Sequence, residues 1–208
     1  MTRTPINKSK RTVMNPAVPG DVVGEVIESD AKQARAAISL AIEAEPGWGA
    51  KPVSKRSALL RRIADLYEEN TSEFLASACR ESGKNLSDGV AEIREAVDFL
   101  RYYADQAPTA ERSTEPRGVI VCISPWNFPL AIFTGQIAAA LVTGNTVIAK
   151  PAEQTPLIAV RATALMHEAG IPEGVVQLLP GGGLSVGAAL VADSRIGGVC
   201  FTGSTEVA

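Results

Sequence analysis

Four short segments in the second half of the chain carry residue types that could do chemistry. Each combines prolines, glycines or polar side chains, and each follows an apolar run typical of a buried strand. They are residues 124–129 (SPWNFP), 150–153 (KPAE), 181–187 (GGGLSVG) and 201–208 (FTGSTEVA). Ligands of parallel α/β sheets bind beyond the carboxyl ends of the strands, so we expect a binding or catalytic site among these segments.

The first segment holds Trp126 and Asn127 between two prolines. Proline fixes φ, so the loop is stiff. A stiff loop can hold an Asn amide where negative charge develops on an oxygen, which is worth about 2.7–4 kcal/mol per donor. The residues alone lend slightly more weight to a simpler interpretation, in which Asn127 caps the next helix and Trp126 fills the core.

The second segment places Lys150 at a strand end and Glu153 three residues later. Both side chains can hydrogen-bond the hydroxyls of a ribose, and a carboxylate there would repel a 2′-phosphate. That pattern favours NAD over NADP. The alternative is a surface ion pair, with Glu153 in a helix first turn where the macrodipole favours an acid.

The other two segments are glycine-containing turns. Gly183 and Gly187 belong to a GxGxxxG spacing that only partly matches a dinucleotide fingerprint, and a flexible loop explains it equally well. Gly203 and Ser204 would open a last helix, whose free N–H groups can hold a pyrophosphate. A plain Ser cap in a turn resembling a capping box is the alternative.

The elements that must position these segments follow from an uneven distribution of charge. Residues 1–120 hold 17 of the 20 Lys and Arg and 18 of the 23 Asp and Glu, which predicts exposed helices followed by a buried sheet. We expect a polar tail over 1–11 and a mainly helical segment over 12–116 that begins with a strand at 22–27. The three helices that we predict there run from an Asp30 cap to Pro46, from Ser54 to Gly83, and from Ser87 to a break at 108–116.

Residues 117–208 alternate short β-branched runs with longer helical runs. This alternation predicts βαβ units and a Rossmann-like parallel sheet with flanking helices. The predicted strands are 118–123, 146–149, 175–179 and 198–201, and the predicted helices are 130–142, 155–169, 184–192 and one that starts at Ser204.

Composition excludes several classes of protein. The net charge is −3, without the basic excess of a nucleic-acid-binding protein. Three Cys and one His, not closely spaced, exclude a zinc ribbon and a disulfide framework. The first residues lack the apolar core of a signal peptide, and the longest apolar run, 137–142, is far below the ~18 residues of a membrane span. We expect a cytoplasmic protein.

The order of the motifs PWNFP, TVIAKPAEQTP, GVVQLLPG and FTGSTEV resembles the aldehyde dehydrogenase superfamily, from about Val13 to Ala208. Longer stretches of the sequence, such as AEIREAVDFLRYYADQA and FTGSTEVA, resemble the Δ1-pyrroline-5-carboxylate dehydrogenase module of the proline utilisation A proteins. Many aldehyde dehydrogenases end the last motif in Gly, and Ala208 in its place fits the proline-catabolic branch.

The resemblance implies NAD-dependent oxidation of L-glutamate γ-semialdehyde to L-glutamate. It makes Asn127 the oxyanion-hole donor and places Phe128 on the wall of the aldehyde tunnel. We add the hypothesis that Glu95, where many relatives have an apolar residue, helps to select the amino-acid-like substrate. The residues assigned to cofactor binding are Trp126, Lys150, Glu153, Gly203 and Ser204, together with Gly183 and Gly187 of the glycine-rich turn.

In the family, the nucleophilic Cys and the general-base Glu lie in later Gly-Gln-x-Cys and Glu-Leu-Gly-Gly segments, and neither segment occurs in these 208 residues. Cys79, Cys122 and Cys200 are predicted to be small core residues. We therefore expect the cofactor half of a longer enzyme. Its partners would be the aldehyde, the rest of the dehydrogenase chain and a proline dehydrogenase domain, in a homo-oligomer. The alternatives are a truncated module that binds NAD or a partner without turnover, and a dehydrogenase for another aldehyde.

Overall fold

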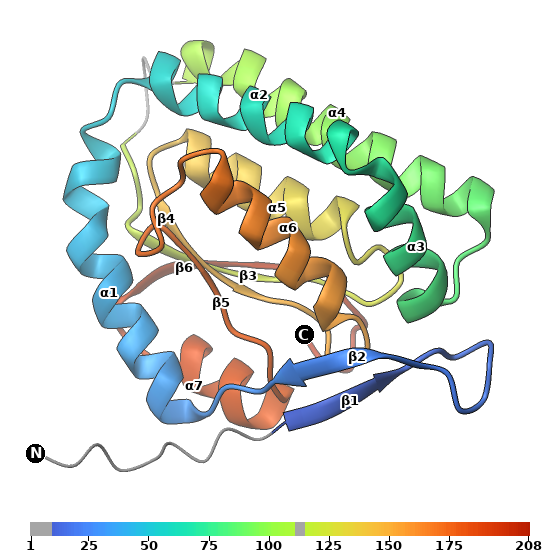
Figure 1. Cartoon of the computed structure of the whole chain (residues 1–208). Coiled ribbons are helices and arrows are strands. Elements are labelled where there is room, and N and C mark those ends of the chain that lie inside the picture. The colour runs from blue at the N-terminus through green and yellow to red at the C-terminus, as the bar shows by residue number, and fades with distance from the viewer. Residues whose placement is uncertain (1–9, 111–114) are drawn as a thin grey trace, which may run out of the picture.

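The computed structural model describes residues 10–110 and 115–208 (Figure 1). A four-stranded sheet lies at its centre in the order β5-β4-β3-β6, and all its ladders are parallel. The strands are β3 (Val119–Ile123), β4 (Thr146–Lys150), β5 (Val176–Leu178) and β6 (Ile196–Phe201). The predicted α/β fold with a parallel sheet is therefore confirmed.

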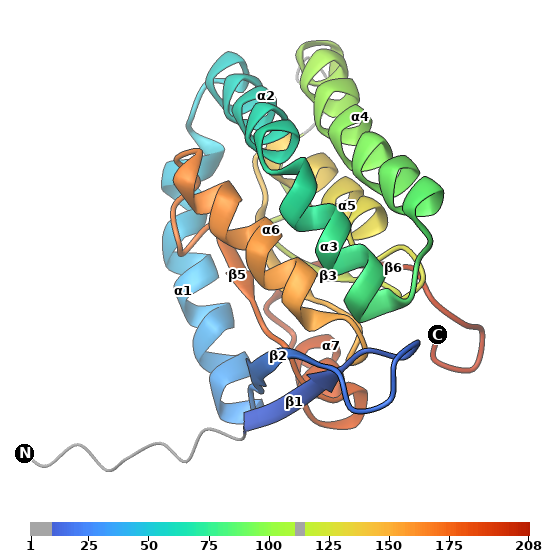
Figure 2. The ribbon, with the colours of Figure 1, turned by 45° about the vertical axis from the view of Figure 1, so that its right-hand side comes forward.

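Helices cover both faces of this sheet (Figures 1 and 2). Strand β4 is buried at every position because apolar layers cover both faces of the sheet. Val147 and Ala149 pack in one layer, and Ile148 packs in the other. The first layer contains α5 (Ala131–Val142) and α6 (Pro156–Glu168), and α2 (Val53–Glu69), α3 (Thr71–Ser82) and α4 (Leu86–Ala110) pack outside them. The second layer contains α1 (Ala31–Gly49) and α7 (Ala188–Val191).

A β-hairpin precedes the helices, and half of it was not predicted. Strand β2 (Val22–Ile27) matches the prediction, but β1 (Lys10–Met14) pairs antiparallel with it. The predicted tail over 1–11 is therefore wrong at Lys10 and Arg11, while residues 1–9 lie outside the described part. A polar strand such as β1 has little apolar alternation to reveal it, and it is held by pairing with β2 and by the ion pair between Lys10 and Glu25.

The first helix begins as predicted and ends later. Asp30 is its N-cap, and a capping box joins Asp30 and Gln33. The helix continues through Pro46 to Gly49, because the buried Trp48 is anchored by its indole N–H, which donates to the carbonyl of Leu141 at 3.0 Å. Packing therefore outweighs the local cost of a proline inside the helix.

The single helix predicted from Ser54 to Gly83 is two helices, α2 and α3, which meet at Asn70. The side-chain amide of Asn70 donates to the carbonyl of Leu66 at 2.8 Å, which satisfies the end of α2. Gly83 ends α3 with φ +71°, as a C-terminal glycine should. Helix α4 is capped by Asn85 rather than Ser87, since the Asn85 side chain accepts from the amide of Asp88.

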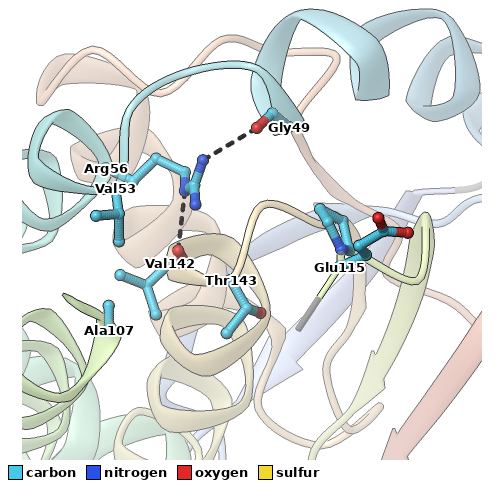
Figure 3. A pocket seen from close by; sticks show the side chains of 8 residues that line it. Gly49, Val53, Arg56, Ala107, Glu115, Val142 and Thr143 are labelled. Atoms are coloured by element: carbon cyan, nitrogen blue, oxygen red, sulfur yellow. Dashed lines mark hydrogen bonds between the residues drawn. The ribbon is translucent and has the colours of Figure 1, made fainter. Parts of the chain in front are cut away.

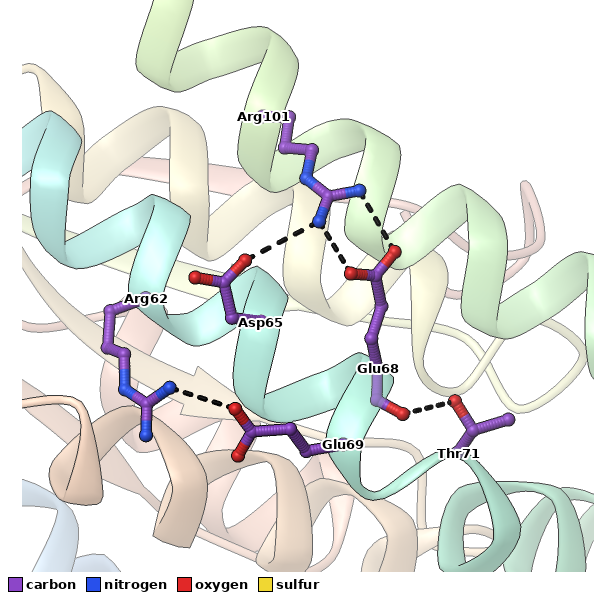
Figure 4. A network of polar contacts seen from close by, with 6 residues as sticks. All are labelled: Arg62, Asp65, Glu68, Glu69, Thr71 and Arg101. Atoms are coloured by element: carbon purple, nitrogen blue, oxygen red, sulfur yellow. Dashed lines mark hydrogen bonds and ion pairs between the residues drawn. The ribbon is translucent and has the colours of Figure 1, made fainter.

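Arg101 of α4 joins this helix to α2 on the outer surface (Figure 4). Its guanidinium donates to both carboxylate oxygens of Glu68, at 2.9 and 2.6 Å, and it lies 3.5 Å from a carboxylate oxygen of Asp65. The hydrogen bonds from Arg101 hold the pKa of Glu68 below its ordinary value. Exposed ion pairs contribute little to stability in general, and the bidentate geometry seen here is the one in which they contribute most.

The later helices differ from prediction mainly after β5. Residues 184–192 form a π-helical turn, η1 (Gly183–Gly187), followed by the short α7. The helix predicted from Ser204 is only a turn, in which the Ser204 carbonyl accepts from the amides of Val207 and Ala208. Among residues 10–110 and 115–208, no helix has the length and apolar character to cross a membrane.

Strand β6 forms one edge of the sheet, with no strand on its outer side among the described residues. Val199 is 45% exposed there. An unpaired strand edge with apolar side chains is a template for association. We expect these 208 residues, made alone, to self-associate, which sedimentation velocity across a wide concentration range would detect. A lysine at the edge, Val199→Lys, should weaken the association, and a sharp, concentration-independent melt of a monomer would contradict this prediction.

Candidate cofactor and substrate site

Three of the four predicted segments leave the sheet at the same level. Ile123, the last residue of β3, pairs in register with Lys150 of β4 and with Phe201 of β6. The first residues beyond the strands continue this alignment, since the amide of Ser124 donates to the carbonyl of Lys150 and the amide of Thr202 donates to the carbonyl of Ile123. The loops after β3, β4 and β6 therefore lie side by side at the carboxyl edge of the sheet.

The fourth segment joins this group through Glu153. A carboxylate oxygen of Glu153 accepts a hydrogen bond from the amide of Gly183 at 2.8 Å. Gly187 lies against the side chain of Lys150, where an added Cβ would be 3.6 Å from Lys150 Cε. Two segments predicted separately, the KPAE loop and the glycine-rich turn, thus form one surface.

Lys150 is 5% exposed, and its ammonium donates to the carbonyl of Pro151 at 3.3 Å. Burial lowers the pKa of Lys150, while the carboxylates of Glu153 and Glu28 oppose that shift. An ammonium and a carboxylate so close together can donate to and accept from a pair of hydroxyls. Sequence reasoning missed Glu28, which lies just after β2.

The hairpin supports this loop through Arg11. The Arg11 guanidinium pairs with Glu28 at 2.5 Å and also donates to the backbone carbonyl of Glu153. Arg11 was assigned to the tail, so sequence reasoning missed it as well. Its only signal was its place in a short basic stretch with Lys8 and Lys10, which points to no partner.

In the loop after β3, Trp126 is 54% exposed and Asn127 is also exposed. The simpler interpretation of these residues is wrong, because Leu130 occupies the N-cap of α5 and Trp126 does not fill the core. Within the described part of the chain, the Asn127 side chain has no hydrogen-bond partner. Its amide is therefore available to an oxygen of a ligand.

The remaining predicted residues have less structural context. Ser204 is exposed and does not open a helix, whereas Gly203 lies against Phe201, whose Cζ would be 2.6 Å from an added Cβ. Glu95 is exposed on α4, one turn after Glu92. The structure brings neither Ser204 nor Glu95 into contact with the Lys150–Glu153 surface.

Two buried glutamates that sequence reasoning missed lie behind the site. Glu81, at the end of α3, accepts hydrogen bonds from the amides of Leu157 and Ile158 at the start of α6, at 2.6 and 2.9 Å. Glu92 of α4 does the same for the amides of Leu130 and Ala131 at the start of α5, at 2.9 Å each. Helical spacing places both on inward faces, but it cannot show which amides they meet.

Cys79, Cys122 and Cys200 are all free cysteines. Burial raises the pKa of the Cys122 thiol, and partial desolvation raises that of Cys200, which disfavours the reactive thiolate of both. The prediction that Cys200 is a core residue is wrong, because β6 is an edge strand and Cys200 is exposed on it. Within the described ranges, no cluster of His, Cys, Asp or Glu could hold a metal ion.

A cavity of about 530 Å³ adjoins the loops and is lined by β1, the end of α3 and the Trp126 loop; Arg11, Glu81, Trp126 and Thr155 are among its residues. A smaller cavity, about 200 Å³, lies at the opposite, amino end of the sheet (Figure 3). There Arg56 donates to the carbonyls of Gly49 and Val142. The larger cavity is thus on the same side as the four segments.

The sequence pattern of the aldehyde dehydrogenase family matches residues 4–208. The chain belongs to this family. It is 55% identical over 198 residues to the bifunctional protein PutA of Escherichia coli, covering 94% of this chain and 15% of PutA. It is 38% identical to the 1-pyrroline-5-carboxylate dehydrogenase of Geobacillus thermodenitrificans, covering 97% of this chain and 42% of that enzyme.

Solved structures agree with this membership. A mutant of Thermus thermophilus 1-pyrroline-5-carboxylate dehydrogenase matches with a TM-score of 0.93 and 40% identity, over 96% of this chain and 42% of that one. A Thermus 1-pyrroline-5-carboxylate dehydrogenase with bound NAD matches with a TM-score of 0.88 and 39% identity, over 91% of this chain and 40% of that one. The chain therefore spans less than half the length of these relatives.

The buried Glu81 generates a test of pH dependence. Burial raises its pKa from 4.5 to about 7, against the opposing hydrogen bonds from Leu157 and Ile158. A raised pKa means that the protonated form favours the folded state, so this contribution is present below about pH 4.5 and is lost as the pH rises through about 7. Its size is on the order of 3 kcal/mol.

We expect the melting temperature of Glu81→Gln relative to the parent to rise between pH 4.5 and 7, the range that the raised pKa defines. Ser72→Ala, an exposed change of an uncharged residue on the same helix, is the control and should keep a constant offset. A constant offset for Glu81→Gln as well would show that Glu81 titrates normally.

Proposed function

We propose that these residues are the cofactor-binding portion of a longer dehydrogenase that oxidises L-glutamate γ-semialdehyde to L-glutamate with NAD⁺ in proline catabolism. The observation that carries the proposal is the meeting of the Asn127 loop with Lys150 and Glu153 at one sheet edge, in a chain 55% identical to a PutA protein. The Thermus 1-pyrroline-5-carboxylate dehydrogenase structure with bound NAD supports the choice of cofactor.

The described residues fit this cofactor. In this proposal Lys150 and Glu153 hydrogen-bond the adenosine ribose, and the negative charge of Glu153 disfavours the 2′-phosphate of NADP. Because Gly187 has no side chain, it does not cover the aliphatic part of the Lys150 side chain. Gly183, Gly203 and Ser204 supply backbone near the phosphates, and Trp126 borders the cofactor. NAD⁺ supplies the hydride acceptor.

On the substrate side, the Asn127 amide donates to the aldehyde oxygen as negative charge develops there. The exposed ring of Phe128 lines the entrance, and Glu95 attracts the amino group of the substrate. By the family resemblance, the nucleophilic thiol and the general base belong to a later part of the enzyme. This portion therefore binds and orients, and the complete chain is needed for turnover.

The proposed partners follow from the relatives. One partner is the remainder of the dehydrogenase chain. A second partner is a proline dehydrogenase domain, in keeping with the description of PutA as bifunctional. We also propose a homo-oligomer for the complete enzyme and a cytoplasmic location, where three free cysteines would stay reduced.

Replacement of Asn127 tests the proposed oxyanion donor. In the complete enzyme, Asn127→Ala should lower kcat about 10²–10³-fold, because one donor to the developing oxyanion is lost. The KM for NAD⁺ should stay within about twofold. Gln106→Ala, which removes an exposed amide on α4, is the control. A kcat for Asn127→Ala equal to that of the control would refute the role, and no activity of the parent on glutamate semialdehyde would refute the substrate.

Replacement of Glu95 tests substrate selection. Glu95→Ala in the complete enzyme should lower kcat/KM for glutamate semialdehyde and leave kcat/KM for a simple aliphatic aldehyde unchanged, because only the first substrate carries an ammonium. Asp98→Ala removes an exposed carboxylate one turn along α4 and serves as the matched control. Unchanged kinetics for Glu95→Ala on both substrates would remove Glu95 from the site.

A further inference from the structure

A buried ion pair lies directly behind the loop that carries Asn127 and Phe128. A carboxylate oxygen of Glu92, whose side chain has no exposed surface, lies 3.1 Å from the ammonium of Lys84, whose side chain is 13% exposed. The other Glu92 oxygen accepts from the amides of Leu130 and Ala131. Glu92 therefore binds the backbone two and three residues after Phe128.

Lys84 reaches the same loop from the side. Its ammonium lies 4.6 Å from the centroid of the Phe128 ring, which is within the range of a cation–π interaction. One ion pair thus contacts the loop twice, with Glu92 on its backbone and Lys84 on its aromatic side chain.

The start of the loop is anchored separately. The side-chain amide of Gln136 donates to the carbonyl of Ile123 at 3.2 Å and to the hydroxyl of Thr202 at 3.0 Å. Pro125 and Pro129 fix φ on either side of Asn127. Asn127 therefore lies in a short, stiff segment held at both ends, although its own side chain is exposed.

Capping of α5 explains the buried carboxylate of Glu92, but it gives little reason to place an ammonium beside that carboxylate. A helix N-terminus is usually capped by a polar residue next to it in sequence, whereas α5 has Leu130 at that position and takes its cap from 38 residues earlier. Burying an ammonium and a carboxylate costs desolvation energy that apolar packing would avoid. What the pair contacts is the Phe128 ring and the backbone that directly follows the Asn127 loop.

We propose that Glu92 and Lys84 are positioning residues for the dehydrogenase reaction, which hold the Asn127 amide and the Phe128 ring in place against the aldehyde. The proposal rests on the proposed function for its kinetic consequence. Neither residue touches the substrate. Both act through the loop, and their effect should fall on the aldehyde and on kcat, not on NAD⁺.

Kinetics of two variants in the complete enzyme test this role. Glu92→Gln keeps an acceptor for the two amides but loses the charge, and Lys84→Met keeps the stem but loses the ammonium. A displacement of about 1 Å costs on the order of 10²-fold in rate. We expect each variant to lose at least about tenfold in kcat/KM for the aldehyde, with the KM for NAD⁺ unchanged. The double variant should lose little more than either single one, because the two act as a pair.

Arg56→Gln is the matched control. Arg56 is also a buried charge that binds α5, but at its other end, where its guanidinium donates to the carbonyl of Val142 at 2.9 Å. This variant should lose melting temperature and keep its kinetic constants. If Glu92→Gln and Lys84→Met lose melting temperature and keep their kinetic constants in the same way, the pair is only structural and the proposal is wrong.

Hydrogen exchange provides a readout that needs no turnover. In Lys84→Met and Glu92→Gln, the amides over residues 124–131 should exchange faster than in the parent, while Arg56→Gln should leave them unchanged. Unchanged exchange in both pair variants would overturn the proposal. Because this measurement is independent of the substrate, it separates a failure of the anchoring from a failure of the proposed function.

Discussion

The first N–H groups of a helix need acceptors, and in α5 and α6 those of Leu130, Ala131 and Ile158 are buried. Neither helix has a side-chain cap next to it in sequence. The acceptors are Glu92 and Glu81, which come from α4 and α3. Since an unpaired buried N–H is costly, the two helices that follow β3 and β4 require the helical segment that precedes them. This requirement joins α3 and α4 to the two helices that flank the sheet.

The same two contacts determine how the proposed site is held. Helix α5 begins directly after the Asn127 loop, and α6 begins directly after the KPAE loop. Fixing the start of each helix therefore fixes the end of each loop, while the in-register strands fix the other end. The exposed Asn127 and the buried Lys150 differ in burial but share this support, and both sit on backbone that has little freedom.

Local patterns were sufficient for much of the fold and for the location of the proposed site. The Asp30 cap, the Gly83 terminus and the βαβ alternation depend on neighbouring residues, and they were predicted. The rule about carboxyl ends of parallel strands correctly placed three loops at one edge. Contacts between distant residues could not be predicted: Arg11 meets Glu153 across 142 positions, and Glu81 meets Leu157 across 76. The exposure of Cys200 likewise depends on its strand being at the edge of the sheet, which strand order decides.

Each glutamate lies far in sequence from the helix that it caps, and this separation affects folding during synthesis. A ribosome adds about 5–20 residues per second, so Glu81 is synthesised roughly 4–15 s before Leu157, its partner 76 residues later. During that interval α3 and α4 can form and pack with α2, but the surface that later meets α5 and α6 has nothing to cover it. The first half of the nascent chain must therefore wait with apolar surface and two acids exposed to solvent, and we expect this stage of synthesis to depend most on chaperones.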